Sequence, residues 1–247
     1  MNAEPQPHGA LVIGASSGIG AACVTELARR GYRVAAVARR EDLLEDLRAA
    51  APEHVRVYGH DVTDLDGTAG VFSQIVDDLG DLSMVIYAAG VMPKIDVDTY
   101  DLEKDKQVID VNLLGCIAWL NQAAPFFKQQ GSGSIVGISS IAGDRGRVGY
   151  PVYNTSKAAM NTYLEALRNR LTRHGVSVTT IKPGYVATVM TEGMDGLFWV
   201  AKPEQAARAI VSAGERGVHT RYVLRRWALI GLIIRCIPSF IFRRMNV

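Results

Sequence analysis

Cysteine is scarce in this chain, and none of it lies in a pattern typical of a disulfide or a metal site. The three cysteines are Cys23, Cys116 and Cys236, with no CxxC pair among them. We therefore predict no metal site and interpret all three as reduced core thiols, which are typical of a cytoplasmic protein. The N-terminal stretch MNAEPQPHGA has neither the basic nor the apolar region of a signal peptide, so none is expected.

Long apolar runs, repeats and low-complexity linkers are missing as well. The apolar run at residues 227–234 has eight residues, whereas a membrane-spanning helix needs about 20. With 48% hydrophobic and 21% charged residues, the composition excludes a wholly disordered chain. Residues 1–247 are predicted to form a single domain.

Basic residues are concentrated at the C-terminal end. Residues 221–247 hold six arginines and no acid, whereas the other 220 residues carry 21 bases and 25 acids. No basic, aromatic-rich stripe runs through that larger part, so no nucleic-acid partner is expected. The segment 225–247 is an apolar, arginine-rich extension in which Pro238 ends a short helix. It could lie in a membrane interface, or it could pack against another subunit or over a substrate cleft.

Short apolar runs alternate with helical patterns along the chain. Strands are expected at 10–13, 33–38, 55–58, 84–87, 133–138, 176–181 and 221–224. Helices are expected at 21–30, 42–50, 65–79, 102–130, 151–174 and 203–216. This alternation predicts βαβ units and an α/β fold with a Rossmann-type, doubly wound parallel sheet in three α/β/α layers.

Three glycines follow the first expected strand, in the sequence GASSGIG at residues 14–20. A glycine-rich turn between strand and helix lets a pyrophosphate approach the backbone, and the helix N-terminus favours its negative charge. The spacing is GxxxGxG rather than the common GxGxxG. The expected contacts to a dinucleotide are Gly14, Ser16, Ser17, Gly18, Ile19 and Gly20.

Two arginines follow the second expected strand, where a dinucleotide fold meets the adenosine ribose. An acid there would bind the 2′-hydroxyl of NAD, whereas arginine accommodates the 2′-phosphate of NADP. This chain has Arg39 and Arg40 and no acid before Glu41. We predict NADP(H) rather than NAD(H), with Arg39 as the main contact and Arg40 as the second. Two solvated arginines at a strand end are the alternative.

A serine, a tyrosine and a lysine form the candidate catalytic set. Tyr153 and Lys157 are four residues apart and share one face of a helix. A phenol has a pKa near ~10, and an ammonium beside it should lower that pKa. Tyr153 is therefore a candidate general acid or base, and the Ser140 hydroxyl could polarise the substrate oxygen. An incidental YxxxK on a surface helix is the alternative.

These motifs together resemble the short-chain dehydrogenase/reductase family over residues 9–220. The resemblance implies hydride transfer between a nicotinamide and a carbonyl or alcohol carbon, and a homodimer or homotetramer. It implies Asn112, in an NxxG setting, as a fourth catalytic residue that holds the water of a proton relay. An asparagine inside an apolar helix needs a local reason such as a kink. A core asparagine bonded to a neighbouring strand is the alternative.

The resemblance also implies cofactor contacts beyond the glycine-rich turn. Asp61 would bind the adenine amino group, although it could also cap a helix starting near Thr63. The family usually has Asn-Asn-Ala-Gly where this chain has YAAG, so Ala88 lacks one supporting hydrogen bond. Lys157 would also hold the nicotinamide ribose. The remaining implied contacts are Val62, Ala89, Gly90, Tyr153, Pro183, Gly184, Val186 and Thr188.

We predict an NADP-dependent oxidoreductase with a small-molecule carbonyl or alcohol substrate. Residues 189–201 would form a mobile lid over the substrate or a loop packed on the core. The C-terminal extension favours an apolar or lipid-linked substrate. One alternative is a non-catalytic NADP(H)-sensing protein. The other is a reductase of lipid metabolism that is cytoplasmic but associated peripherally with a membrane.

Overall fold

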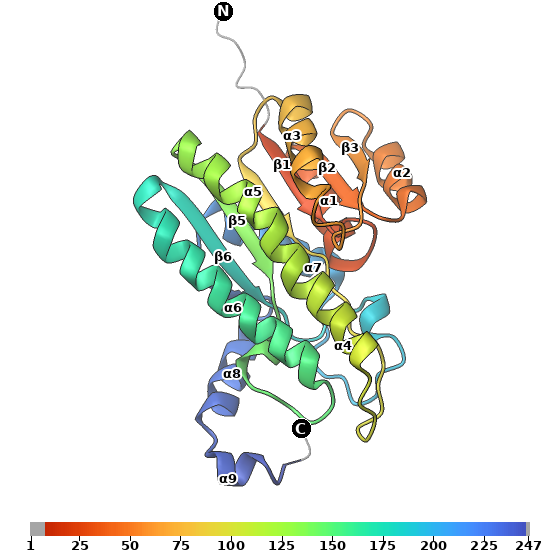
Figure 1. Cartoon of the computed structure of the whole chain (residues 1–247), viewed down its shortest axis with the longest axis vertical. Helices are drawn as coiled ribbons and strands as arrows, with labels where there is room; N and C mark the ends of the chain where they lie inside the picture. Colours follow the sequence, from red (N-terminus) through yellow and green to blue (C-terminus); the bar gives the residue numbers. More distant parts are fainter. Residues whose placement is uncertain (1–7, 246–247) are drawn as a thin grey trace, which may run out of the picture.

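Seven parallel strands form one sheet in the order β3-β2-β1-β4-β5-β6-β7 (Figure 1). The computed structural model describes residues 8–245. The chain adds β2 and β3 on one side of β1 and then continues with β4 on the other side, so the strand order reverses beside β1. The strands are β1 Gly9–Ile13, β2 Arg33–Ala38, β3 Val55–Gly59, β4 Met84–Tyr87, β5 Gly133–Ile138, β6 Val176–Lys182 and β7 Thr220–Tyr222. The predicted Rossmann-type fold is confirmed.

Helices cover both faces of the sheet because the central strands are apolar on both sides. In β1, Ala10 and Val12 face one core cluster, while Leu11 and Ile13 face the other. Figure 1 shows α5 and α6 crossing one face of the sheet. The helices are α1 Gly18–Arg29, α2 Glu41–Ala50, α3 Thr68–Leu79, α4 Leu102–Ile109, α5 Gly115–Gln130, α6 Pro151–Leu171, α7 Pro203–Glu215, α8 Arg226–Cys236 and α9 Ser239–Phe242.

Helix α3 begins later than predicted, and the capping role offered for Asp61 is wrong. Asp61 Oδ1 accepts hydrogen bonds from the backbone N–H of Thr63 at 2.9 Å and from its hydroxyl at 2.8 Å. These bonds close a turn rather than open a helix, and α3 starts at Thr68. A side-chain-stabilised turn competes with helix here, which the apolar spacing alone does not reveal.

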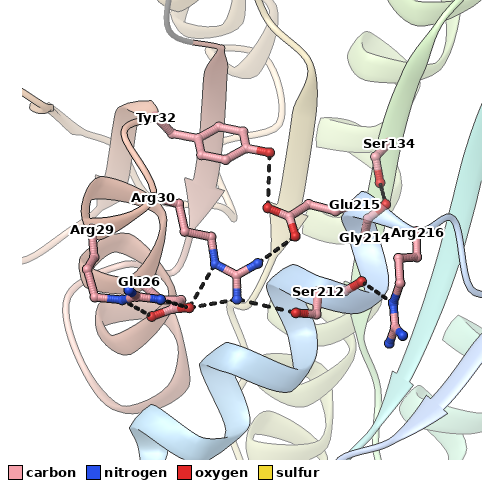
Figure 2. Close-up of polar contacts among 9 residues, drawn as sticks. All are labelled: Glu26, Arg29, Arg30, Tyr32, Ser134, Ser212, Gly214, Glu215 and Arg216. Carbon is pink, nitrogen blue, oxygen red and sulfur yellow. Dashed lines mark hydrogen bonds and ion pairs between the residues drawn. The ribbon is translucent and has the colours of Figure 1, made fainter.

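Arg30, which follows α1 and is paired with the buried Glu26 carboxylate, joins α1 to α7 on the face of the sheet opposite α5. Figure 2 shows Glu26 between Arg29 and Arg30, with Arg30 also reaching Ser212 and Glu215 of α7. Arg29 Nε and Arg30 Nε each donate to Glu26 at 2.8 Å, and Arg30 Nη1 donates to Glu215 at 2.5 Å. The hydrogen bond from Arg29, supported by Arg30, lowers the pKa of Glu26 from 4.5 to about 2. Glu26 therefore stays charged in the folded protein.

The C-terminal segment folds as α8 and α9 beside the end of β7 (Figure 1). Trp227 is buried against Gly184, where a Cβ would lie 2.1 Å from the Trp227 ring. Cys236 is exposed on α8, so its interpretation as a core thiol is wrong, whereas Cys23 and Cys116 are buried as predicted. No helix within residues 8–245 is long and apolar enough to cross a membrane.

Candidate active site

The glycine-rich turn lies at the carboxyl edge of the sheet, between β1 and α1. The N–H groups of Gly14 and Ala15 donate to the Val37 carbonyl at 2.9 and 3.0 Å. Gly14 has a φ of 85°, and a Cβ on it would lie 2.4 Å from the Ala89 nitrogen. The turn can pack this closely on the end of β4 only because residue 14 has no side chain.

The two arginines after β2 lie differently. Arg40 Nη2 donates to the hydroxyls of Ser16 at 2.9 Å and Ser17 at 2.8 Å, so its guanidinium lies across the glycine-rich turn. Arg39 is largely exposed and pairs with Asp61, with 3.4 Å between Nη1 and Oδ2. Burial acts to raise the pKa of Asp61, but the hydrogen bonds from Thr63, with a smaller contribution from Arg39, lower it overall. The predicted basic site at the end of β2 is thus formed by both arginines, and Arg40 contacts the turn.

The serine, tyrosine and lysine come together where β5 ends and α6 begins. Ser140 precedes a 3-10 turn at Ile141–Asp144, and its hydroxyl accepts from the Ala142 N–H at 3.0 Å. Tyr153 and Lys157 share one face of α6 as predicted, with the lysine nitrogen 5.8 Å from the tyrosine ring centre. Lys157 is buried and donates to the Ile138 carbonyl at 3.0 Å.

The electrostatics of this set differ from the prediction. Burial raises the pKa of Tyr153, while a hydrogen bond with Ser140 and the charge of Arg147 oppose that rise. Burial also lowers the pKa of Lys157 from 10.5 to about 8. The predicted lowering of the Tyr153 pKa by Lys157 is therefore wrong. The lysine amine points to a backbone carbonyl, and Ser140 and Arg147 are the groups that stabilise a phenolate.

Asn112 lies in a π-helical turn, Asp110–Leu114, which separates α4 from α5 within the single helix predicted there. Its Oδ1 accepts from the Val91 N–H at 2.7 Å, and its Nδ2 donates to the Val91 carbonyl at 3.0 Å and to the Ser156 hydroxyl at 3.1 Å. The side chain is thus bonded to the segment after β4, which was the alternative interpretation. The kink is also present, and such turns are frequent at functional sites.

Tyr87 occupies a position where the family motif usually has asparagine, and its side chain contacts the π-helical turn that contains Asn112. Its hydroxyl donates to the Val111 carbonyl inside the π-helical turn at 2.5 Å. The Ala88 backbone remains bonded to Ile13 at 2.8 Å, so the central strand keeps its connection to β1.

Gly90 lies between two predicted catalytic side chains. A Cβ on Gly90 would lie 3.4 Å from Asn112 Oδ1 and 3.5 Å from Lys157 Nζ. The absence of a side chain therefore leaves the space in front of the amide and the amine open. This brings Asn112, Lys157 and the end of β4 to one place at the carboxyl edge of the sheet.

The segment after β6 faces the N-terminus of α1. A Cβ on Gly18 would lie 3.1 Å from the Thr188 methyl group. Val186 is buried and forms a parallel bridge with Ala201. A groove of about 910 Å³, largely open to solvent, lies between α1 and residues 187–208, with Gly18 and Thr188 in its wall. It is lined by none of Ser140, Tyr153 and Lys157, so it is not the catalytic pocket.

The predicted lid, residues 189–201, packs on the C-terminal extension through aromatic rings. Phe198 lies 5.0 Å from Trp227, and Trp199 lies 5.7 Å from it, between ring centres. Trp199 has a φ of 51°, which is uncommon for a bulky residue. Through these ring contacts the loop packs on the C-terminal extension, with Phe198 and Trp199 partly exposed, and not on the core as the alternative interpretation had it. Its role as a mobile lid stays a prediction.

Comparison with known proteins identifies the family. Residues 8–195 match the family described as short chain dehydrogenase. The chain belongs to this family. An uncharacterized oxidoreductase of Myxococcus xanthus is 38% identical over 192 residues, which cover 76% of each chain. An uncharacterized oxidoreductase of Mycobacterium tuberculosis is 32% identical over 212 residues, or 83% of this chain and 84% of the relative.

Solved structures of short chain dehydrogenases are similar over nearly the whole chain. One from Burkholderia cenocepacia, in complex with NADP, is 25% identical, covers 98% of both chains and has a TM-score of 0.85. Another, from Streptomyces avermitilis, is 25% identical, covers 92% of both chains and has a TM-score of 0.82. The protein is thus an oxidoreductase of the short chain dehydrogenase family, as its motifs predicted.

In this short chain dehydrogenase, sequence reasoning missed two residues of the site. Arg147 acts on Tyr153 by its charge, and Ser156 bonds the Asn112 amide. Ser156 adjoins Lys157 in the sequence, but no pattern distinguishes it from other helical serines. Arg147 lies in the segment between Ser140 and Tyr153. Only the folded path of that segment shows that its charge lies near the Tyr153 hydroxyl.

Proposed function

We propose that this protein is an NADP(H)-dependent oxidoreductase that interconverts a carbonyl and an alcohol. The observation that carries the proposal is that Ser140, Tyr153 and Lys157 meet where β5 ends and α6 begins, with Lys157 next to Gly90. Intact catalytic side chains argue against a purely sensing protein, which would need only the cofactor cleft.

The cleft fits a phosphorylated dinucleotide. The turn at Gly14 and Gly18 has positive φ values and no side chains where a pyrophosphate would approach. Arg40 and the hydroxyls of Ser16 and Ser17 form a donor set suited to a phosphate. We assign Arg40 the main 2′-phosphate contact in place of Arg39, because Arg39 is paired with Asp61. The Burkholderia cenocepacia relative was solved in complex with NADP, which supports NADP(H) as the cofactor.

The catalytic residues would move a proton to and from the substrate oxygen. When bound, the nicotinamide supplies or accepts the hydride. Because its pKa is raised, the Tyr153 hydroxyl is protonated at neutral pH, which is the form that donates a proton to a carbonyl oxygen. The Ser140 hydroxyl orients the same oxygen. With a pKa of about 8, Lys157 can exchange a proton near neutral pH, and Asn112 lies beside it to support the relay.

We further propose an apolar substrate, handled in the cytoplasm by a homodimer or homotetramer. A recess beside Tyr153 has a volume of only about 10 Å³, so it indicates the polarity next to the tyrosine and not the size of a substrate. Its lining is mostly apolar and includes Met92, Pro93, Ile95, Val108 and Val152, together with Tyr150, Lys104 and Asp105. Apolar walls with few polar groups suit a substrate whose carbonyl is its main polar feature.

A carbonyl panel followed by NADPH oxidation tests the reaction. On a substrate so identified, Tyr153→Phe should lower turnover by roughly two to four orders of magnitude, as for loss of a general acid, while NADPH still binds. Tyr163→Phe is the matched control, since Tyr163 lies on the same helix and bonds Asn121 instead. Near wild-type turnover in Tyr153→Phe would disprove the assignment, and NADPH binding without turnover of any carbonyl would favour the sensing alternative.

A further inference from the structure

Helix α8 presents an apolar face to solvent. Leu229, Leu232, Ile233 and Cys236 are all exposed, Leu229 at 62%, and their spacing places them on one side of the helix. Phe240 on α9, 58% exposed, follows the same segment, together with Ile241 and Met245. Contiguous exposed apolar surface of this kind marks an interaction site.

The other side of α8 is also apolar, and it is already packed. Trp227 is buried, and a Cβ on Gly231 would lie 2.7 Å from Asp144 Oδ2 and 2.9 Å from the Tyr222 hydroxyl. Asp144 is in turn paired with Lys182. The helix therefore has a fixed inner side, so its outer apolar side is not needed for the fold of one chain.

Exposed arginines surround this apolar surface, at positions 225, 226, 235, 243 and 244. No acidic residue occurs in 221–247. None of the five takes part in the salt bridges found within residues 8–245. Arg226 stacks on Trp199, and Arg235 bonds the Gly231 carbonyl, contacts that leave their charges unneutralised.

The surface is attached to the segment that carries Ser140. Arg145 Nη1 donates to the carbonyls of Ile234 at 2.7 Å and Ile237 at 2.5 Å, and its guanidinium lies 4.0 Å from the centre of the Phe242 ring. Figure 1 shows α8 and α9 at the same end of the molecule as the start of α6. A partner bound there would lie next to the segment between Ser140 and Tyr153.

We propose that α8 and α9 bind the surface of an anionic membrane. Apolar side chains would enter the boundary between headgroups and acyl chains, and the surrounding arginines would meet anionic headgroups. A second copy fits less well, because a twofold contact through α8 would bring two sets of unpaired arginines together. The proposal goes beyond the proposed reaction and does not depend on it, although it would give an apolar substrate a short route to the site.

Sedimentation with vesicles tests the proposal on the full chain. Wild type should bind vesicles of phosphatidylcholine mixed equally with phosphatidylglycerol, bind phosphatidylcholine alone much less, and be released by salt. Arg243→Gln with Arg244→Gln should weaken binding roughly 25-fold, about fivefold for each arginine. The matched control is Arg170→Gln with Arg173→Gln, the same charge change on exposed residues at the C-terminal end of α6 and in the 3-10 turn that follows it, which should leave binding unchanged.

A second variant pair tests the apolar contribution. Leu232→Ser should weaken vesicle binding about tenfold or more, as expected for losing one buried leucine side chain. Leu102→Ser, at a position that is 70% exposed on α4, should have no effect. Circular dichroism of each variant establishes that it is folded. The proposal is overturned if wild type does not bind anionic vesicles. It is also overturned if Leu232→Ser leaves vesicle binding intact and instead changes the mass measured by analytical ultracentrifugation, because a second copy would then be the partner.

Discussion

Replacing Glu26 by glutamine should lower the free energy of unfolding by about 3 kcal/mol at neutral pH. The substitution keeps the size of the side chain and removes its charge. Arg29 and Arg30 hold the pKa of Glu26 at about 2, against an ordinary value of 4.5. Each unit of pKa shift corresponds to ~1.36 kcal/mol of stability, which gives the size of the expected loss. Solvent screens this interaction little, because the Glu26 side chain is only 8% exposed.

The sign of the pH dependence follows from the lowered pKa. The unfolded chain binds a proton at Glu26 more readily than the folded protein, so the contribution is fully present above about pH 4.5. It is lost as the pH falls toward 2, the pKa of Glu26 in the folded protein. Urea unfolding followed by circular dichroism should therefore show wild type and variant far apart at neutral pH and converging in acid.

A surface pair on α2 gives the control. Glu45 and Arg48 form an ion pair whose side chains are 46% and 55% exposed. Such pairs contribute about 0 to 1 kcal/mol, so Glu45→Gln should change stability little at any pH. The reasoning would be refuted if the two substitutions lowered the free energy of unfolding equally. It would also be refuted if the effect of Glu26→Gln stayed constant from neutral to acid pH, because stability would then not come from the charge of Glu26 beside Arg29 and Arg30.

Two further predictions concern the cofactor and the C-terminal segment. Arg40→Ser should weaken NADPH binding about tenfold more than NADH binding, as expected for loss of one charge-assisted contact to the 2′-phosphate. Arg39→Ser should show a smaller difference between the two cofactors. Fluorescence titration of both variants with NADPH and NADH tests this, and the same difference in both variants would reject it. Gly184→Ala should cost about 1 to 3 kcal/mol by overpacking, because its Cβ would meet the Trp227 ring at 2.1 Å. Gly70→Ala on α3, which meets open space, should not destabilise the protein, and equal urea midpoints for the two alanine variants would count against the packing argument.

The strands could be predicted from the sequence because both faces of the parallel sheet are buried. Continuous apolar runs mark such strands, and β2, β4 and β5 begin and end at the predicted residues. The break within 102–130 was also anticipated, since Asn112 is poorly suited to an apolar helix. The start of α3 was not, because it depends on the side chain of Asp61 closing a turn.

The candidate site was predictable in its residue types but not in its interactions. Ser140, Tyr153 and Lys157 meet as their spacing indicated. The shift of the Tyr153 pKa is set by burial, which raises it, and by Ser140 and Arg147, which oppose the rise. The burial and the position of Arg147 follow from how the segment 141–150 is folded. The different roles of Arg39 and Arg40 likewise follow from partners far away in the sequence, at Asp61 and at Ser16.

The aromatic contact between residues 189–201 and α8 gives the protein an intrinsic optical probe. Two of the three tryptophans, Trp199 and Trp227, meet edge to face at this contact, while Trp119 is fully buried in the core. The Arg226 guanidinium lies 4.6 Å from the Trp199 ring centre, close enough to influence its emission. Movement of the loop away from α8 would change the surroundings of the Trp199 and Trp227 indoles and leave Trp119 as an internal reference. Opening of the loop can therefore be followed in the unlabelled protein.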